Sequence, residues 1–600
     1  MKYPNLSDSK VIAFDVETYD PSLKELGPGV YRKDGNVLGM AIANEQGFAE
    51  YYNLGHPNTD KSLKEKNLNY IKEVMKIKTK KLGANILYDL DWTENFLGVK
   101  VEGDLHDIQV AETLLNENQR AYNLNFLTSK YTNEVKKLNL LEDFCRKNNL
   151  TGEVRSHIYL MPFERVREYA IGDVTGPIEI FKKQWSLMNS QKLLELYHLE
   201  MSLFPLLLQM RHNGVRIDQG KIKEGIIYLR KSIKEKSEEL YSEYGEFNYD
   251  SSKQIAKVFD RLGIKYPSTE KGNPNLEKSV LEFQIDHPIA AKILALKKTN
   301  KILNTFFINS LSGHNVNGRI HCSFHPNKTD EYGAKSGRFS SSDPNLQQIP
   351  SKEETFGNLC RSIFIPEEGC TWGKNDYNQI EYRLIAHYAV GEGAEEIRKK
   401  YRDDPNTDYH QTIMDLTGLN RPQAKVLNFG MAYLMGARTM NRKFGWPVSE
   451  CQSLIDLYNR EVPFVKATRN WVIQVARGRG FIRTILGRRA RVTPEMVRAH
   501  KEFSMYNRLI QGSAADLLKK AMSECYKAGI FEVLKLHLTV HDELDYSIPH
   551  TKEAVEACKE QKHIMENCLT LKVPVTVDVE TGPNWGNVKE FNFKLKELTT

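Results

Sequence analysis

The sequence predicts two units, an α/β unit at the amino end and a larger mixed unit of helices and strands after it. Short apolar strands at 10–18, 37–43 and 80–92, with helical patterns around the last two, predict the first unit. From about 185 to 245 the apolar residues recur at helical spacing. The 600 residues also exceed what a single hydrophobic core supports. We therefore place a domain boundary near residue 190.

The composition is that of a globular protein, with 40% hydrophobic and 27% charged residues. The longest apolar run, Leu203–Met210, is too short to span a bilayer, and the amino end lacks the apolar core of a secretion signal. Eight cysteines without a CxxC pair predict neither disulfides nor a structural zinc. We expect a cytoplasmic protein with no membrane partner. The net charge of +7 is compatible with nucleic acid but does not decide for it.

The first constellation of reactive residues contains four carboxylates and a tyrosine. Asp15 and Glu17 lie two apart in a strand, so their side chains leave the same face. Two close carboxylates repel each other unless a cation lies between them, which suggests divalent metal, although most such pairs are ordinary surface residues. Asp89 follows the third strand, and Tyr169 and Asp173 lie four apart on one side of a helix.

These residues resemble the three acidic motifs of the proofreading 3′→5′ exonuclease fold, in the subclass with tyrosine in the last motif. The matches are DVET (15–18), NILYD (85–89) and YAIGD (169–173). The resemblance implies an RNase H-like α/β domain of the DEDDy type that acts on single-stranded DNA 3′ ends. It implies that the four carboxylates hold two Mg²⁺ ions and that Tyr169 orients the attacking water. Asp91 is a rival for the second motif, but the family spacing favours Asp89.

The second constellation begins with two segments far apart in the chain. KNDYNQIEYRLIAHYA (374–389) reads as a polar turn that becomes a helix capped by Asn378 and Glu381, which places Asp376 just before the helix. KLHLTVHDELDYSI (535–548) reads as a hairpin with His541, Asp542 and Glu543 at its tight connection.

Between these segments, RPQAKVLNFGMAYLMG (421–436) predicts a helix with one unusual stripe. Arg421, Lys425, Phe429 and Tyr433 recur every fourth residue, with two cations followed by two rings. A surface helix could also carry this stripe. In a nucleotide-binding site, the two cations of this stripe would bind a triphosphate and the two rings would contact a sugar and a base.

DYNQIEYR, RPQAKVLNFGMAY and VHDE resemble, in order, the three polymerase motifs of the DNA polymerase I family, family A. Further matches to this family are SGRFSSSDPNLQQIP (336–350), GFIRTILGRRAR (480–491), YNRLIQGSAADLLK (506–519) and GPNW (582–585). The resemblance covers essentially residues 1–600. It implies the exonuclease domain at 1–190 and, at 191–600, an α+β polymerase domain shaped like a right hand. The thumb would span about 215–305, the fingers about 400–500, and the palm the remaining segments.

The resemblance also implies roles for individual residues. Asp376 and Asp542 would hold two Mg²⁺ ions, which Mn²⁺ can replace, with help from the Tyr377 carbonyl, and Glu543 would support them. Lys425 would protonate the leaving pyrophosphate. Glu381 would exclude a 2′-hydroxyl, and Tyr433 would stack at the template position. The dNTP-binding residues would be Tyr377, Gln379, Glu381, His410, Arg421, Lys425, Phe429 and Tyr433. The residues that contact primer-template DNA would be Arg338, Gln348, Asn507, Gln511 and His541.

The chain departs from the family pattern at three neighbours of the chemistry, namely Asn378 for serine, Phe339 for leucine and Phe503 for arginine. These departures bear on nucleotide affinity or fidelity rather than on metal binding. We expect the arginines between 477 and 491 to contact phosphate. We also expect a monomer without a 5′ nuclease domain, from a phage or a bacterium, that serves replication or repair and has replication accessory proteins as further partners.

Three alternatives are a protein with nuclease activity alone, a single-subunit RNA polymerase and an inactive DNA clamp. The complete set of Asp376, Lys425 and Asp542 argues against the first and the third. The exonuclease motifs and Glu381 favour DNA synthesis over RNA synthesis.

Overall fold

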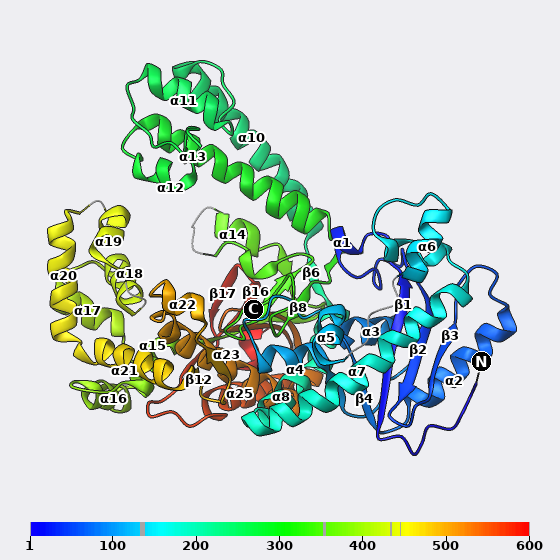
Figure 1. Ribbon diagram of the computed structural model, residues 1–600. Coiled ribbons are helices and arrows are strands. Elements are labelled where there is room, and N and C mark those ends of the chain that lie inside the picture. The colour runs from blue at the N-terminus through cyan, green and yellow to red at the C-terminus, as the bar shows by residue number, and fades with distance from the viewer. Residues whose placement is uncertain are drawn as a thin grey trace.

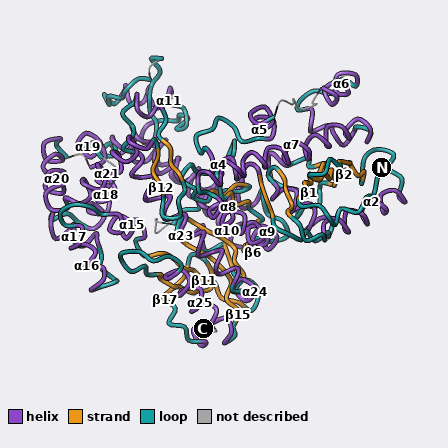
Figure 2. The backbone as a smooth tube through the Cα atoms, turned by 60° about the horizontal axis from the view of Figure 1, so that its bottom comes forward, coloured by secondary structure: helices purple, strands orange, loops and turns teal. Residues whose placement is uncertain are grey.

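The computed structural model describes residues 2–132, 139–269, 271–351, 356–432, 435–444 and 446–598. Figure 1 shows an amino-terminal sheet on the right, a second sheet near the centre, a group of helices on the left and a helical arm that projects above them. In Figure 2 the group on the left is almost wholly helical, whereas the strands lie in the rest of the molecule. None of the described helices is long and apolar enough to cross a membrane.

The amino-terminal sheet has five strands in the order β3-β2-β1-β4-β5. β1 pairs antiparallel with β2 and parallel with β4. The long helix α7 (Phe163–Gln191) packs across β1, β2 and β3, so its buried stripe covers the apolar face of these strands. The strands are β1 (Val11–Tyr19), β2 (Asn36–Asn44), β3 (Ala49–Asn53), β4 (Lys80–Gly83) and β5 (Leu105–Asp107).

The third predicted strand is shorter than expected. β4 ends at Gly83, and residues Ile86–Asp91 form helix α3. Asn85 adopts a left-handed conformation (φ 64°), and a carboxylate oxygen of Asp107 accepts the Ile86 N–H at 2.8 Å. This turn and cap start a helix where the apolar run suggested a continued strand, so Asp89 lies on a helix and does not directly follow a strand.

A helical stretch follows, as the sequence predicts. It contains α8 (Leu194–Ser202) and α9 (Phe204–Asn213), and it ends at Gly214 (φ 58°) before β6 (Val215–Ile217). The projecting arm has a small hydrophobic core of its own, separate from the main core. Its helices are α10 (Gln219–Tyr244), α11 (Ser252–Arg261), α12 (Lys278–Phe283) and α13 (Pro288–Lys301), and η3 (Ile302–Ser312) continues α13.

The central sheet is antiparallel, in the order β14-β15-β11-β16-β17. Helix α25 (Lys552–Asn567) packs on this sheet, and α23 (Ser504–Lys527) packs on α25. Trp372 and Trp585 are fully buried in its core. The strands are β11 (Cys370–Tyr377), β14 (Lys535–Val540), β15 (Glu543–Pro549), β16 (Val577–Asn584) and β17 (Asn587–Glu590).

The segment around Asp376 is a strand, whereas the sequence suggested a polar turn. β11 pairs with both β15 and β16 up to its end, and this double pairing keeps Asp376 extended. Helix α15 (Ile380–Tyr388) starts after Gln379, whose φ is 50°. The predicted cap by Asn378 and Glu381 is therefore wrong, while the predicted hairpin around Asp542 is confirmed by β14 and β15.

The group of helices on the left of Figure 1 contains the predicted helix of residues 421–436, which is observed as α18 (Arg421–Ala432). Tyr433 lies outside the described residues, as does the side chain of Phe429. The other helices of the group are α16 (Ala394–Asp403), α17 (Tyr409–Thr417), α19 (Ala437–Phe444), α20 (Val448–Glu461) and α21 (Pro463–Arg479).

Two candidate active sites

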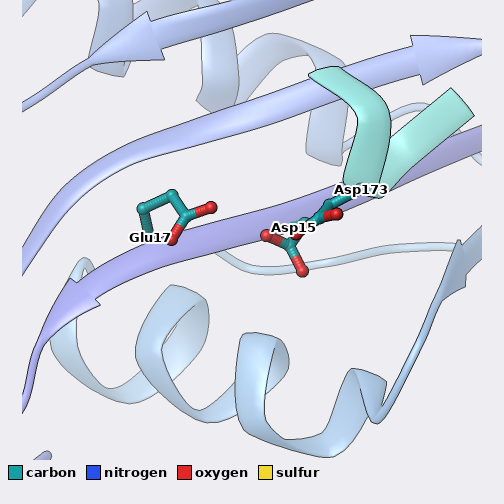
Figure 3. Close-up of side chains that lie close together, drawn as sticks. All are labelled: Asp15, Glu17 and Asp173. Atoms are coloured by element: carbon teal, nitrogen blue, oxygen red, sulfur yellow. The ribbon is translucent and has the colours of Figure 1, made fainter. Parts of the chain in front are cut away.

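The first site lies where α7 crosses β1. Asp15 and Glu17 leave one face of the strand, and Asp173 on α7 meets them, as Figure 3 shows. One carboxylate oxygen from each residue lies within 4.8 Å of the other two. Carboxylate oxygens gathered at this spacing are the ligands that Mg²⁺ prefers, so these residues fit a divalent metal.

Tyr169 lies one helical turn before Asp173 on α7 and is 3% exposed. Burial, followed by the charges of Glu17 and Asp173, raises the pKa of its phenol well above 10. The hydroxyl therefore keeps its proton and can orient a water by hydrogen bonding.

Asp89 lies beside this cluster but is not one of the three residues whose oxygens converge. Its Oδ1 accepts the main-chain N–H of Val16, between Asp15 and Glu17, at 3.0 Å. Burial, followed by repulsion from Asp107 and Glu17, raises the pKa of Asp89 well above its usual value. The rival Asp91 forms a buried ion pair with Arg211 at 3.1 Å, and this pairing supports the choice of Asp89.

The second site lies on the central sheet. Asp376 is near the end of β11, and Asp542 is in the turn before β15, where its carbonyl accepts the Tyr377 N–H at 3.3 Å. Burial and then the charge of Glu543 raise the pKa of Asp376 to about 7. Burial raises the pKa of Asp542 to about 6, against the opposing charge of Arg338. Such crowding of carboxylates fits a site made for divalent cations.

Residues 4–189 match the family model for 3′-5′ exonuclease, and residues 221–587 match the model for DNA polymerase family A. The chain belongs to DNA polymerase family A. It is a DNA-directed DNA polymerase with a 3′→5′ exonuclease, and it performs template-directed synthesis with proofreading. The predicted family and the predicted order of the two folds are confirmed.

Three similar proteins illustrate the range of this family. A DNA-directed DNA polymerase of Pseudomonas phage M6 is 34% identical over 97% of this chain and 95% of its own. The thermostable DNA polymerase I of Thermus aquaticus is 33% identical over 68% of this chain and 51% of its own. The POL domain of Pol1 from M. smegmatis, solved with DNA primer-template and dNTP, shares the fold with a TM-score of 0.79 at 23% identity, and the match covers 97% of this chain and 96% of that one.

In this family A polymerase, an unexpected group of charges surrounds Asp376. The strand register places Lys374 opposite Asp545 and Glu580, and Asp376 opposite Glu543, all on one face of the sheet. The Lys374 ammonium lies 2.7 Å from Glu580 and 3.7 Å from Glu543. Trp585 Nε1 also donates to Glu543 at 2.9 Å. The Glu543 carboxylate is therefore already bound by Lys374 and Trp585, which fits the expectation that it supports the metal ligands and is not a principal ligand itself.

Several residues predicted to bind nucleotide lie around Asp408, at the start of α17. Arg421 pairs with Asp408 at 2.5 Å, the Gln379 amide donates to it at 3.3 Å, and its side chain accepts the His410 N–H. His410 is buried, which lowers the pKa of its ring. Lys425 is exposed one helical turn beyond Arg421 on α18.

Arg338 lies between Glu381, which is predicted to bind nucleotide, and the carboxylate of Asp542. Arg338 donates to Glu381 at 2.6 Å and lies 4.0 Å from Asp542. Asn507 and Gln511 lie one turn apart on α23, and the buried Asn507 Oδ1 accepts no hydrogen bond from the described residues. Gln348 and His541 are exposed, and His541 adopts a φ of 57° in the turn before β15.

The prediction that the arginines between 477 and 491 contact phosphate is wrong for two of them. Arg488 is 5% exposed and forms ion pairs with Glu200 and Asp516. Arg491 pairs with Glu117 at 2.7 Å. Two of the acidic partners are distant in the chain: Glu200 lies 288 residues before Arg488, and Glu117 lies 374 residues before Arg491. Nothing in the local sequence of the arginines indicates this pairing.

Proposed function

We propose that Asp15, Glu17, Asp89 and Asp173 form the proofreading site and that Asp376 and Asp542 form the synthetic site, each with two Mg²⁺ ions. The observation that carries this proposal is the convergence of carboxylates at two separate places, one in each of the two matched regions. The domain limits we propose are 1–190 for the exonuclease and 191–600 for the polymerase, with the thumb at about 215–305 and the fingers at about 400–500.

At the synthetic site, the chain binds primer-template DNA and a dNTP. When bound, Mg²⁺ or Mn²⁺ would supply Lewis-acid stabilisation of the attacking 3′-oxygen and of the triphosphate. Arg421, Lys425 and His410 bind the triphosphate, and Lys425 donates a proton to the leaving pyrophosphate. Gln379, Phe429 and Tyr433 complete the nucleotide pocket, and the Tyr377 carbonyl adds a metal ligand.

Arg338, Gln348, Asn507, Gln511 and His541 contact the minor groove and the primer end. Contacts of this kind test the geometry of a base pair rather than its identity, because the minor-groove acceptors are nearly the same in every pair. Asn507 Oδ1, which is buried without a hydrogen bond from the described part of the chain, supports this assignment, as does the exposure of Gln348 and His541.

At the proofreading site, the substrate is a single-stranded DNA 3′ end. The carboxylates hold the metal ions that would activate water and stabilise the leaving oxygen when bound. Tyr169 keeps its proton and orients the attacking water, since its phenol pKa is raised.

The simplest test of both activities is extension of a recessed primer with dNTPs, with rNTPs or with neither, in the presence of magnesium. We expect elongation with dNTPs, little with rNTPs, and shortening of the primer when no nucleotide is present. We also propose that the enzyme works as a monomer in the cytoplasm of a bacterium or a phage-infected host, with replication accessory proteins as further partners. The phage relative supports this setting.

Sugar selection tests the role of Glu381. Its side chain fills space beside the proposed sugar position, so Glu381→Ala should admit ribonucleotides about ten- to a hundredfold more readily relative to dNTPs, the range that a close polar or steric contact gives. The loss of the contact with Arg338 should also slow dNTP addition. The ratio of kcat/KM for dNTP and rNTP measures the effect. An unchanged ratio would place the discriminating residue elsewhere.

The magnesium requirement of primer extension should fall as the pH rises. A carboxylate binds metal in its ionised form, and with a pKa of about 7 Asp376 is mostly protonated at pH 6 and mostly ionised at pH 8 before metal binds. We therefore expect roughly tenfold less Mg²⁺ for half-maximal extension at pH 8 than at pH 6. DNA affinity measured over the same range serves as the control, and a flat magnesium requirement would contradict the expectation.

A further inference from the structure

A tyrosine two strands away lies beside the carboxylates of the proofreading site. On the sheet, Tyr51 of β3 is opposite Ala41 of β2, which is opposite Asp15 of β1. Two residues along β2 and on the same face, Gly39 is opposite Glu17. A Cβ atom on Gly39 would overlap the Tyr51 hydroxyl. Because directly opposed Cβ positions are about 5 Å apart, this hydroxyl lies within reach of the Glu17 side chain.

The donor and the acceptor in the hydrogen bond between Tyr51 and His56 can be assigned. The phenol oxygen lies 2.7 Å from Nε2 of His56, and Nδ1 of His56 lies 2.9 Å from the carbonyl oxygen of Met161. A carbonyl can only accept, so Nδ1 carries the ring proton and Nε2 is the acceptor. Tyr51 therefore donates to His56. Burial lowers the pKa of His56 to about 4, so the ring remains neutral at the pH of DNA synthesis.

Tyr51 and His56 also contact the start of α7, the helix that carries Asp173. The ring of Tyr51 stacks on Phe163, the first residue of α7, at 5.6 Å between centroids and 8° between planes. Met161, which accepts from His56, lies two residues earlier and is fully buried. Tyr51 and His56 are buried as well, so the hydrogen-bonded chain has little freedom to rearrange.

We propose that His56 is a positioning residue of the exonuclease, which holds the Tyr51 proton away from Glu17 and so prevents this hydroxyl from competing with divalent metal for the carboxylate. The inference rests on the proposed metal site of Asp15, Glu17 and Asp173. When the acceptor at position 56 is lost, the Tyr51 hydroxyl turns towards the Glu17 carboxylate, which lies opposite Gly39. A hydrogen bond from Tyr51 then competes with metal for the carboxylate.

The test is a double-mutant cycle on the full chain, read as the Mg²⁺ concentration that gives half-maximal degradation of a single-stranded 3′ end. His56→Leu should raise this concentration about tenfold, the usual effect of losing a partner of a metal ligand. In the Tyr51→Phe background, which lacks the competing hydroxyl, the same substitution should raise it by less than about twofold. Mn²⁺ binding followed by electron paramagnetic resonance, in a chain that also carries Asp376→Asn and Asp542→Asn, should show the same pattern without turnover.

Two further variants control for folding. His56→Gln keeps an amide oxygen that can accept from Tyr51, so its Mg²⁺ requirement should remain within about threefold of the wild type. Tyr52→Phe removes a hydroxyl on the other face of the same strand, where Tyr52 donates to the Lys2 carbonyl, and should leave the requirement unchanged. Primer extension by each variant shows that the rest of the chain is folded.

Equal effects of His56→Leu in both backgrounds would overturn the proposal, as would a tenfold rise with a folded His56→Gln variant. Failure of the metal site itself has a different result. If the metal site is assigned wrongly, Asp15→Ala will not reduce degradation of 3′ ends. If only the inference about His56 is wrong, Asp15→Ala will still abolish degradation.

Discussion

Asp542→Asn should lower nucleotide addition about a thousandfold or more, while the protein still binds DNA. Asparagine keeps the size of aspartate but removes the negative charge with which the turn before β15 holds metal. Loss of metal-assisted charge stabilisation raises the barrier by several kcal/mol, and each 1.36 kcal/mol is about a factor of ten in rate. Asp376→Asn should behave in the same way, because both residues lie at the carboxylate-rich end of β11 and β15. Single-turnover extension with saturating dNTP measures the effect.

Asp578→Asn is the matched control for these two variants. Asp578 is exposed and lies opposite Asp376 on β16, on the same face of the sheet, yet we do not propose it as a ligand. Its substitution should change extension by less than about tenfold. DNA affinity should persist in all three variants, because it rests on many phosphate contacts. Near-normal extension by Asp542→Asn would show that the hairpin is not part of the synthetic site.

The sequence could predict the acidic positions because local geometry fixes their spacing. Residues that are two apart in a strand point to the same face, which brings Asp15 and Glu17 together. Residues that are four apart in a helix lie on the same side, which aligns Tyr169 with Asp173. The end of β4 was less predictable. The apolar run continues past Gly83, and the cap that starts α3 comes from Asp107, a residue outside the run.

Contacts between distant segments could not be predicted in this way. Neither Glu200 nor Arg488 has a local pattern that predicts a buried ion pair, and a cluster of arginines is more often a phosphate-binding surface. Lys374 likewise looked like one more polar residue before a helix. Only the pairing of β11 with β15 and β16 places it among the carboxylates. Such contacts depend on register, which the local sequence does not determine.

The combined substitution Asp15→Ala and Glu17→Ala should abolish degradation of single-stranded 3′ ends and leave primer extension within about twofold of the wild type. The two residues supply two of the three carboxylates that converge below α7, so their loss removes most of the charge that holds metal there. The synthetic site has carboxylates of its own on a different sheet, so it does not share this loss.

Asp104→Ala provides the matched control for this pair of substitutions. Asp104 is exposed just before β5, away from the converging carboxylates, so its loss should affect neither activity. Degradation of a 5′-labelled single strand and extension of a recessed primer, measured on the same preparations, separate the two reactions. The double variant should also extend primers with a mismatched 3′ end without first removing the mismatch, because synthesis remains and excision does not. If extension of matched primers fell as far as degradation in a folded protein, the two sites could not be chemically independent, and the assignment of separate metal centres to β1 and β11 would be wrong.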